Sequence, residues 1–89
     1  MLFGAQIRAA RGLLNMSVAE LSDRTGLAVN TIRRAESENG PVKITNANCA
    51  LLESTFESLG VIFIAPEQFG PGVRLRGPDP LPRQTRRRD

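Results

Sequence analysis

The stretch that decides the fold is SVAELSDRTGLAVNTIRR, residues 17–34, because it carries signals for starting, stopping and restarting a helix. Ser17 is followed three positions later by Glu20, the spacing of a capping box, in which each side chain satisfies a backbone donor of the other residue. This predicts a helix over Val18–Thr25. Gly26 then suits the left-handed conformation that ends a helix and turns the chain. A third helix is predicted over residues 28–37.

The two helices flanking Gly26 are predicted to pack together as a helix-turn-helix. Leu21 and Ile32 would point into one small core, and glycine lets the chain turn between them without a Cβ clash. The second helix of such a pair can enter the major groove of DNA. Its outward positions would be Val29, Asn30, Arg33 and Arg34. An alternative interpretation makes the two arginines an ordinary solvated helix face.

Two further helices frame this pair. Over Gly4–Leu14, apolar residues recur at helical spacing at Ile7, Ala10 and Leu14, with Arg8 and Arg11 on an adjoining face. Thr45 can cap a fourth helix that reaches Leu59, and Gly60 closes its end. The apolar stripe expected on that helix consists of Cys49, Leu52, Phe56 and Leu59.

The C-terminal third of the chain changes character. A β-branched run at Val61–Ile64, a turn-forming EQFGPG and an alternating VRLR predict a β-hairpin that pairs residues 61–64 with residues 73–76. A two-stranded hairpin alone is barely stable in water, so it must pack on a helix or pair with a second copy. Residues 77–89, rich in proline and charge, are predicted to form a disordered basic tail.

Length and charge bound the remaining possibilities. With 89 residues the chain forms one small domain that buries about 60–65% of its unfolded surface, so a homodimer is expected. The net charge is +3, but residues 1–76 hold eight basic and seven acidic side chains. The body is therefore nearly neutral, and charge alone is weak support for nucleic-acid binding. Eleven of the twelve basic residues are arginine, which suits bidentate contacts with phosphate and guanine.

Several function classes are disfavoured. The chain has no histidine and only one cysteine, Cys49, so we expect no enzyme, no metal site and no cofactor. The lone cysteine fits a reducing compartment and is expected to be a small core residue. Arginines interrupt the apolar N-terminal segment, and no apolar run reaches the roughly 18 residues of a membrane helix. We therefore expect a cytoplasmic protein without a membrane partner.

The segment QIRAARGLLNMSVAELSDRTGLAVNTIRRAE, residues 6–36, resembles the Cro/CI-type, or Xre, helix-turn-helix regulators. The matching features are an arginine-bearing first helix followed, at the family's spacing, by Ser17, Glu20-Leu21, Gly26-Leu27, Thr31-Ile32 and Glu36. The segment LLESTFESLGVIFIAPEQFGPGVRLR also looks like the helix and hairpin that end some small bacterial Xre-like proteins. The resemblance implies a mainly α, four-helix DNA-binding domain over residues 1–60, a hairpin over residues 61–76 that packs or dimerises, and the tail.

What the resemblance implies for function is sequence-specific binding of duplex DNA by a homodimer in transcription regulation. The family's base-reading positions fall on Val29, Asn30 and Arg34, with Arg33 nearby. The chemistry fits, since arginine can bind guanine, asparagine adenine, and valine a thymine methyl group. Candidate phosphate contacts are Thr31, Ser17, Arg8 and Arg11. Arginines at such positions are more often surface or intrahelical partners than phosphate ligands, which leaves that alternative open for both.

The chain departs from the family pattern at two positions. Val18 replaces a glutamine that typically binds phosphate or supports base reading, and Ala28 replaces a polar residue before the recognition helix. Both departures remove a polar group from the expected DNA surface. They leave open a rival function, a protein-binding module such as an antiactivator or antitoxin that retains the helix-turn-helix fold but holds a protein partner.

Overall fold

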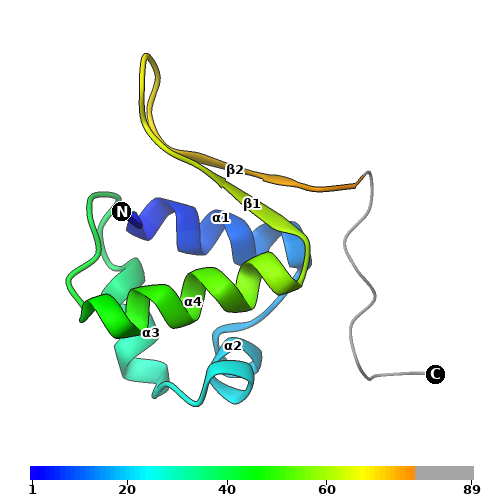
Figure 1. The fold of residues 1–89 in the computed structure, drawn as a ribbon. Coiled ribbons are helices and arrows are strands. Elements are labelled where there is room, and N and C mark those ends of the chain that lie inside the picture. Colours follow the sequence, from blue (N-terminus) through cyan, green and yellow to red (C-terminus); the bar gives the residue numbers. More distant parts are fainter. Residues whose placement is uncertain (78–89) are drawn as a thin grey trace.

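The chain folds as four helices followed by a two-stranded antiparallel hairpin (Figure 1). The computed structural model describes residues 1–77, so the predicted tail, apart from Gly77, lies outside the described residues. The elements are α1 (Gly4–Leu14), α2 (Val18–Thr25), α3 (Val29–Glu36), α4 (Asn46–Ser58), β1 (Val61–Ile64) and β2 (Gly72–Leu75). The mainly helical class expected from the sequence is therefore observed. Within residues 1–77, no helix has the length and apolar character needed to cross a bilayer.

Local sequence signals set the helix boundaries. Ser17 Oγ accepts from the Glu20 N–H at 3.0 Å, and Glu20 Oε1 accepts from the Ser17 N–H at 2.9 Å, so the predicted capping box is confirmed. Gly26 ends α2 with φ of 78°, in the left-handed region that favours glycine. Thr45 caps α4 by accepting from the Asn48 N–H at 3.1 Å.

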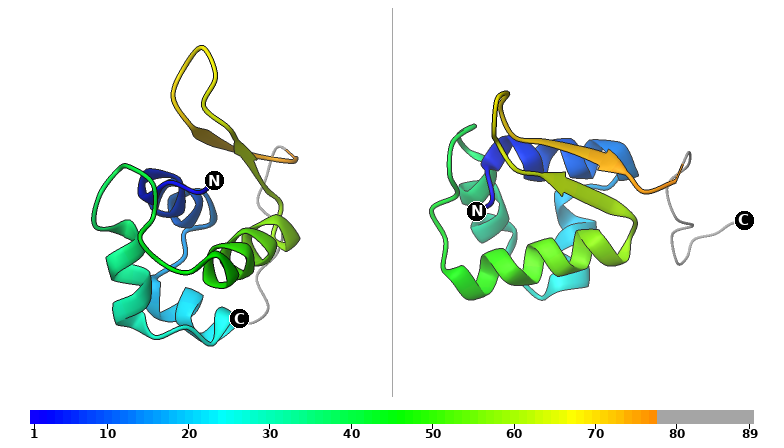
Figure 2. Two further views of the ribbon diagram at one scale, coloured as in Figure 1. Left: turned by 60° about the vertical axis from the view of Figure 1, so that its left-hand side comes forward. Right: turned by 45° about the horizontal axis from the view of Figure 1, so that its top comes forward.

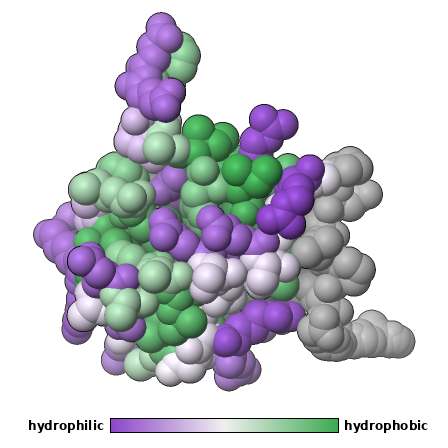
Figure 3. Space-filling model, viewed as in Figure 1, coloured by the Kyte–Doolittle hydropathy of each residue, from purple (hydrophilic) through white to green (hydrophobic). Residues whose placement is uncertain are grey.

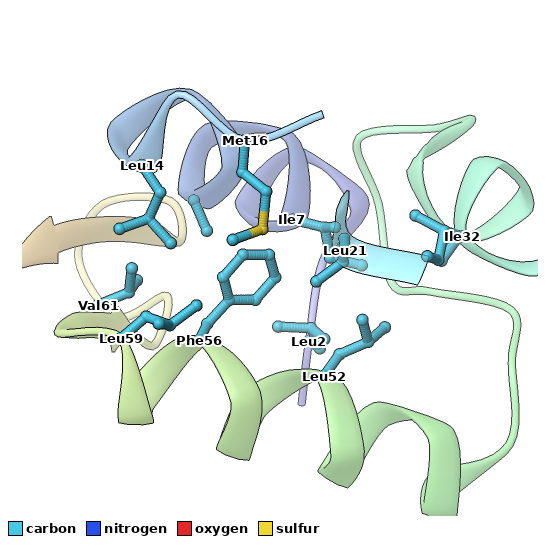
Figure 4. Close-up of a cluster of buried hydrophobic side chains, with 12 residues drawn as sticks. Leu2, Ile7, Leu14, Met16, Leu21, Ile32, Leu52, Phe56, Leu59 and Val61 are labelled. Carbon is cyan, nitrogen blue, oxygen red and sulfur yellow. The ribbon is translucent and has the colours of Figure 1, made fainter. Parts of the chain in front are cut away.

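All four helices contribute to one core (Figure 4). Phe56 points from α4 toward α1, where Leu14 and Met16 approach it, and its side chain is fully buried. Leu21 and Ile32 of the helix pair are also fully buried, as the sequence predicts. The core consists of Leu2, Ile7, Ala10, Leu14, Met16, Leu21, Ile32, Ala35, Leu52, Phe56, Leu59 and Val61. Cys49 was predicted to be a small core residue. It packs against the core but is only half-buried, so the prediction is confirmed in part.

The N-terminal residues tie α1 to the loop after α3. The Val42 N–H donates to Leu2 O at 3.0 Å, and the Gly4 N–H donates to Gly40 O at 2.9 Å. A Cβ added at Gly4 would lie 1.9 Å from Glu38 O and 2.7 Å from Ala35 O. Only glycine therefore permits this close approach of the two backbones.

The hairpin pairs Val61 with Leu75 and Phe63 with Val73 on its inner face. Phe63 meets Phe56 edge to face, with ring centroids 6.0 Å apart. The second strand was predicted over residues 73–76, one residue later than the observed Gly72–Leu75. The shift arises because Gly72 pairs with Ile64 at the end of the ladder.

A buried glutamine fixes the hairpin to α1. Gln6 is 3% exposed, and its Nε2 donates to Ile64 O at 3.1 Å and to Gly72 O at 2.9 Å. Its Oε1 accepts from the Phe3 N–H at 3.0 Å. One side chain thus bonds two carbonyl groups of the distant hairpin and one N–H group at the start of α1, so it ties the end of the ladder to α1.

The hairpin lies over α1 and α4, away from the α2–α3 pair (Figure 2). In the left-hand view of Figure 2 the hairpin tip projects at the top, and α2 and α3 lie in the lower part of the body. This arrangement leaves the outer surface of α3 uncovered by the hairpin.

Candidate nucleic-acid interface

The turn between α2 and α3 is held by side chains as well as by glycine. Ser22 Oγ donates to Leu27 O at 2.6 Å, and the Leu27 N–H donates to Thr25 Oγ1 at 3.1 Å. Thr25 Oγ1 also donates to Leu21 O at 2.8 Å. The two bonds to Leu27 cross the turn, so they help to fix the orientation of α3 relative to α2. This role of Ser22 and Thr25 was not predicted from the sequence, although hydroxyl residues flanking a glycine turn are a recognisable signal.

The outer face of α3 carries polar side chains that the fold leaves unused. Asn30, Arg33 and Arg34 are exposed. Among residues 1–77, these three side chains make no hydrogen bond or ion pair with the rest of the chain. Ile32, Ala35 and Glu36 occupy the buried face of the same helix. The buried face therefore holds α3 against the rest of the fold, while the polar groups of its outer face remain available to a partner.

Val29 differs from the other three predicted base-reading residues. It is half-buried at the first position of α3, with part of its side chain still accessible. Ala28, the residue before it, supplies no side-chain hydrogen bond to the start of the helix. The N–H groups of the first turn of α3 therefore lack a side-chain cap, as the sequence predicts.

A shallow groove of about 460 Å³ adjoins the α3 surface. It is lined by Thr31, Arg34, Lys43, Ile44, Thr45 and Asn48. The predicted phosphate residue Thr31 and the predicted base reader Arg34 thus lie beside the only lysine of the chain and the start of α4. Lys43 and Asn48 were not predicted from the sequence as site residues. The signal that could have found them is the lone lysine two residues before the capping Thr45.

Arg11 forms a partly buried ion pair with Glu36. Arg11 Nε lies 2.6 Å from Glu36 Oε2, and Arg11 Nη2 donates to Glu36 Oε1 at 2.8 Å. Arg11 Nη1 also donates to Met16 O at 3.0 Å. The hydrogen bonds to Glu36 raise the pKa of Arg11 against the lowering effect of burial. The residue joins α1 to α3, so its predicted phosphate contact has a structural competitor within the fold.

Arg8 has similar intramolecular partners. Its Nη1 donates to Glu36 O and its Nη2 donates to the side chain of Asn39. Both bonds bind α1 to the end of α3 and the loop that follows. These contacts are tertiary rather than the surface or intrahelical contacts that the sequence left open, and the phosphate contact of Arg8 remains a prediction.

Three predicted phosphate residues surround a second shallow hollow of about 380 Å³. Its lining consists of Arg8, Arg11, Gly12, Asn15, Met16, Ser17 and Glu20. The hollow brings Ser17 close to both first-helix arginines, as a phosphate site requires. The carboxylate of Glu20 also lines it, and negative charge there opposes an anion. The groove beside Thr31 therefore offers the better environment for phosphate.

The described part of the chain shows no group of three or more cysteine, aspartate, glutamate or histidine side chains that could hold a metal ion. No family model, no curated protein and no solved structure matches this chain.

Proposed function

We propose that the protein is a sequence-specific DNA-binding regulator that reads duplex DNA as a homodimer through α3. The observation that carries the proposal is that the side chains of Asn30, Arg33 and Arg34 are exposed and have no partner within residues 1–77. These side chains lie on the second helix of a turn-linked pair. A bidentate arginine–guanine or asparagine–adenine pair is worth about 1–3 kcal/mol of base discrimination.

The distribution of arginines supports this proposal. Arg8 and Arg11 form hydrogen bonds that join α1 to α3, whereas the side chains of Arg33 and Arg34 form none within residues 1–77. Within residues 1–77, the pair on α3 remains free beside a groove that contributes Lys43 and the hydroxyl of Thr31. Base readers and phosphate contacts would then lie on adjoining surfaces, as a DNA-binding helix requires.

The direct test is selection of ligands from a random duplex DNA library at about 0.15 M salt. The proposal predicts enrichment of a two-fold symmetric motif by the wild-type protein. Failure to enrich any motif would contradict sequence-specific binding. Binding that is sequence-blind and is abolished by modest salt would show a nonspecific charge interaction instead.

A protein-binding module is the second candidate, and two observations favour it. Ala28 gives α3 no side-chain cap, and Val18 removes a polar group from the start of α2. The hairpin also exposes apolar side chains, including Phe69, which is 78% exposed. A stable complex with another protein, together with absence of motif enrichment, would establish this function in place of DNA reading.

A further inference from the structure

A pocket of about 340 Å³ opens where the N-terminal residues, the loop after α3 and the helix α4 meet. In the left-hand view of Figure 2 the N-terminus lies above the start of α4, beside that loop. The wall of the pocket is mainly apolar and is built from Leu2, Pro41, Val42, Ile44, Cys49 and Ala50. Sites for small molecules are concave and mostly apolar, with a few polar groups, and the volume of this pocket lies in their range.

Backbone pairing holds two walls of the pocket in place. The Val42 N–H donates to Leu2 O at 3.0 Å, and Phe3 forms an antiparallel bridge with Pro41. Leu2 is itself a core residue and is only 1% exposed. The third wall is α4, which Thr45 caps. Because each wall belongs to a fixed part of the fold, the pocket is formed before any ligand enters it.

One face of α4 brings a carboxylate to the pocket. Asn46, Ala50 and Glu53 follow one another at spacings of four and three residues, which places them on one side of the helix. Glu53 is half-buried, and its side chain makes no hydrogen bond or ion pair within residues 1–77. No lysine or arginine of these residues lines the pocket. A group that can only accept hydrogen bonds therefore borders an apolar hollow that has no basic side chain.

The charge of Glu53 acts inside the pocket. Burial is the first cause that raises the pKa of the Cys49 thiol, and the charge of Glu53 is the second. The α-amino group of Met1 acts on the same thiol in the opposite direction and more weakly. The electrostatic influence of the carboxylate therefore exceeds that of the amino group beside Cys49, and this favours a positively charged ligand.

We propose that this pocket is an effector site for a small apolar monoamine, whose ammonium group pairs with Glu53 and whose hydrocarbon body lies against Leu2 and Ile44. An ammonium donor matches the carboxylate, and such charge-assisted bonds are among the stronger ones. No aromatic side chain within residues 1–77 lines the pocket, so it offers no cage for a quaternary ammonium. Glu53 lies about 10 Å along α4 from Asn46, so the cation stays away from the positive end of the helix.

The pocket shares a wall with the proposed DNA surface. Val42 and Ile44 line the pocket, whereas Lys43 between them lines the groove beside Thr31 and Arg34. Ile44 borders both the pocket and the groove. A ligand that contacts Val42 and Ile44 therefore stabilises the segment that carries Lys43. Because a segment that is already ordered costs less to bind a second partner, the occupied pocket should strengthen DNA binding.

This inference rests on the proposed function for the effect on DNA but not for the binding of the amine. Coupling between two sites is reciprocal, so DNA should tighten amine binding by the same factor. Amine binding without motif enrichment would retain the pocket and reject DNA reading. Motif enrichment without amine binding would retain DNA reading and reject the pocket as a ligand site.

Three probes with the same chain length test the pocket in the full chain. They are n-hexylamine, n-hexanol and n-hexanoate, which differ in the charge of the head group. Amide chemical shifts measured by NMR report where each probe binds and how tightly. We expect n-hexylamine to shift the amides of Val42, Cys49 and Glu53 and to bind at least about tenfold more tightly than n-hexanoate.

Two pairs of variants separate the charge of the site from its shape. Glu53→Gln should abolish the preference for the amine over the alcohol, whereas Glu57→Gln, on α4 but outside the pocket, should keep it. Ala50→Phe fills the pocket from an exposed helix position and should weaken binding of all three probes. Ala47→Phe, at an exposed position of α4 outside the pocket, is its matched control. Far-ultraviolet circular dichroism checks that each variant is folded.

The effect on DNA has its own readout. Saturating n-hexylamine should raise the affinity of the wild-type protein for its selected DNA motif by about fivefold or more. Ala50→Phe at the same amine concentration controls for the action of the amine as a salt on the DNA. An equal response of wild type and Ala50→Phe would reject the effector role.

Either of two results with the probes would overturn the ligand site itself. One is the absence of amide shifts with n-hexylamine up to about 20 mM, or equal binding of n-hexylamine and n-hexanoate. The other is a set of shifts confined to the hairpin, which exposes Ile62 and Ile64. Figure 3 shows hydrophobic colour gathered over the strands below the hydrophilic tip, so shifts confined there would show adsorption to that surface instead.

Discussion

Arg11 on α1 and Glu36 at the end of α3 form a two-pronged ion pair, with Nε–Oε2 at 2.6 Å and Nη2–Oε1 at 2.8 Å. Glu36 is only 8% exposed and the Arg11 side chain is 21% exposed, so the pair joins the two helices at a partly buried position. Met16 O accepts a further bond from Arg11, which links the α1–α2 connection to the same guanidinium. The position of α3, and with it the proposed reading face, depends on this contact.

Removing one partner of the pair should destabilise the fold. Arg11→Met leaves the Glu36 carboxylate buried without its cation, and we expect a loss of about 3 kcal/mol in the free energy of unfolding. The double variant Arg11→Met, Glu36→Leu should recover most of that loss because it leaves no uncompensated charge. Urea denaturation of both variants measures this difference. Equal stability of the single and double variants would contradict the buried-pair account.

Titration of Arg11 should not change the contribution of the ion pair to the free energy of unfolding across the usual pH range. Its hydrogen bonds raise the pKa of Arg11, and a cation with a raised pKa loses its stabilising effect only as pH climbs through that pKa. Because the ordinary arginine pKa already lies far above this interval, no loss is expected between about pH 6 and 10. The difference in unfolding free energy between wild type and Arg11→Met should stay constant over that interval in buffered denaturation series.

Two glycines of α1 should respond in opposite directions to alanine. A Cβ at Gly4 would lie 1.9 Å from Glu38 O, so Gly4→Ala must separate two backbones and should cost about 3 kcal/mol. Gly12 has no atom within 4 Å of an added Cβ, so Gly12→Ala should stabilise the helix by about 0.5–1 kcal/mol. Thermal unfolding of both variants compares them directly. A neutral Gly4→Ala would show that α1 does not approach the loop as closely as described.

The hairpin should loosen when its glutamine anchor is removed. Gln6→Leu deprives Ile64 O and Gly72 O of a donor and leaves the Phe3 N–H without its acceptor. We expect a loss of about 2 kcal/mol and faster hydrogen exchange of hairpin amides than of α4 amides. Gln68→Leu, in the exposed hairpin loop, is the matched control and should change neither quantity. Unchanged hairpin exchange in Gln6→Leu would contradict the anchoring role.

The thiol of Cys49 should be a poor nucleophile at neutral pH. Burial, followed by the nearby charge of Glu53, raises its pKa above the ordinary value. The folded state therefore disfavours the thiolate, so stability present below the ordinary thiol pKa should fall as pH rises above about 9. Alkylation by iodoacetamide should be slower in the native protein than in urea, and Cys49→Ala should lack this part of the alkaline decline. Equal alkylation rates would rule out the shift.

Local sequence signals predicted much of this fold because they act over a few residues. The Ser17 capping box, the turn at Gly26 and the cap at Thr45 each depend on neighbours within four positions. Gln6 and Glu36 could not be predicted in the same way. Their partners lie far along the chain, at residues 64, 72 and 11, and only the folded arrangement brings them together.

Local sequence patterns likewise predicted some features of the candidate site and not those that depend on tertiary packing. Exposure of Asn30, Arg33 and Arg34 follows from helical periodicity, and the structure agrees with it. The internal use of Arg8 and Arg11 and the groove that adds Lys43 to Thr31 depend on how α1, α3 and the following loop pack. A pattern on one helix cannot contain that information.

The central claim is that α3 reads bases, and the most direct measurement compares the DNA motifs selected by wild type and by Arg34→Ala. Arg24→Ala, at an exposed arginine near the end of α2, serves as the matched loss of one charge. The account predicts that Arg34→Ala weakens binding by about 1–3 kcal/mol and blurs one base pair in each half-site, while Arg24→Ala keeps the motif intact. Identical motifs for wild type and Arg34→Ala, or no motif at all, would contradict it.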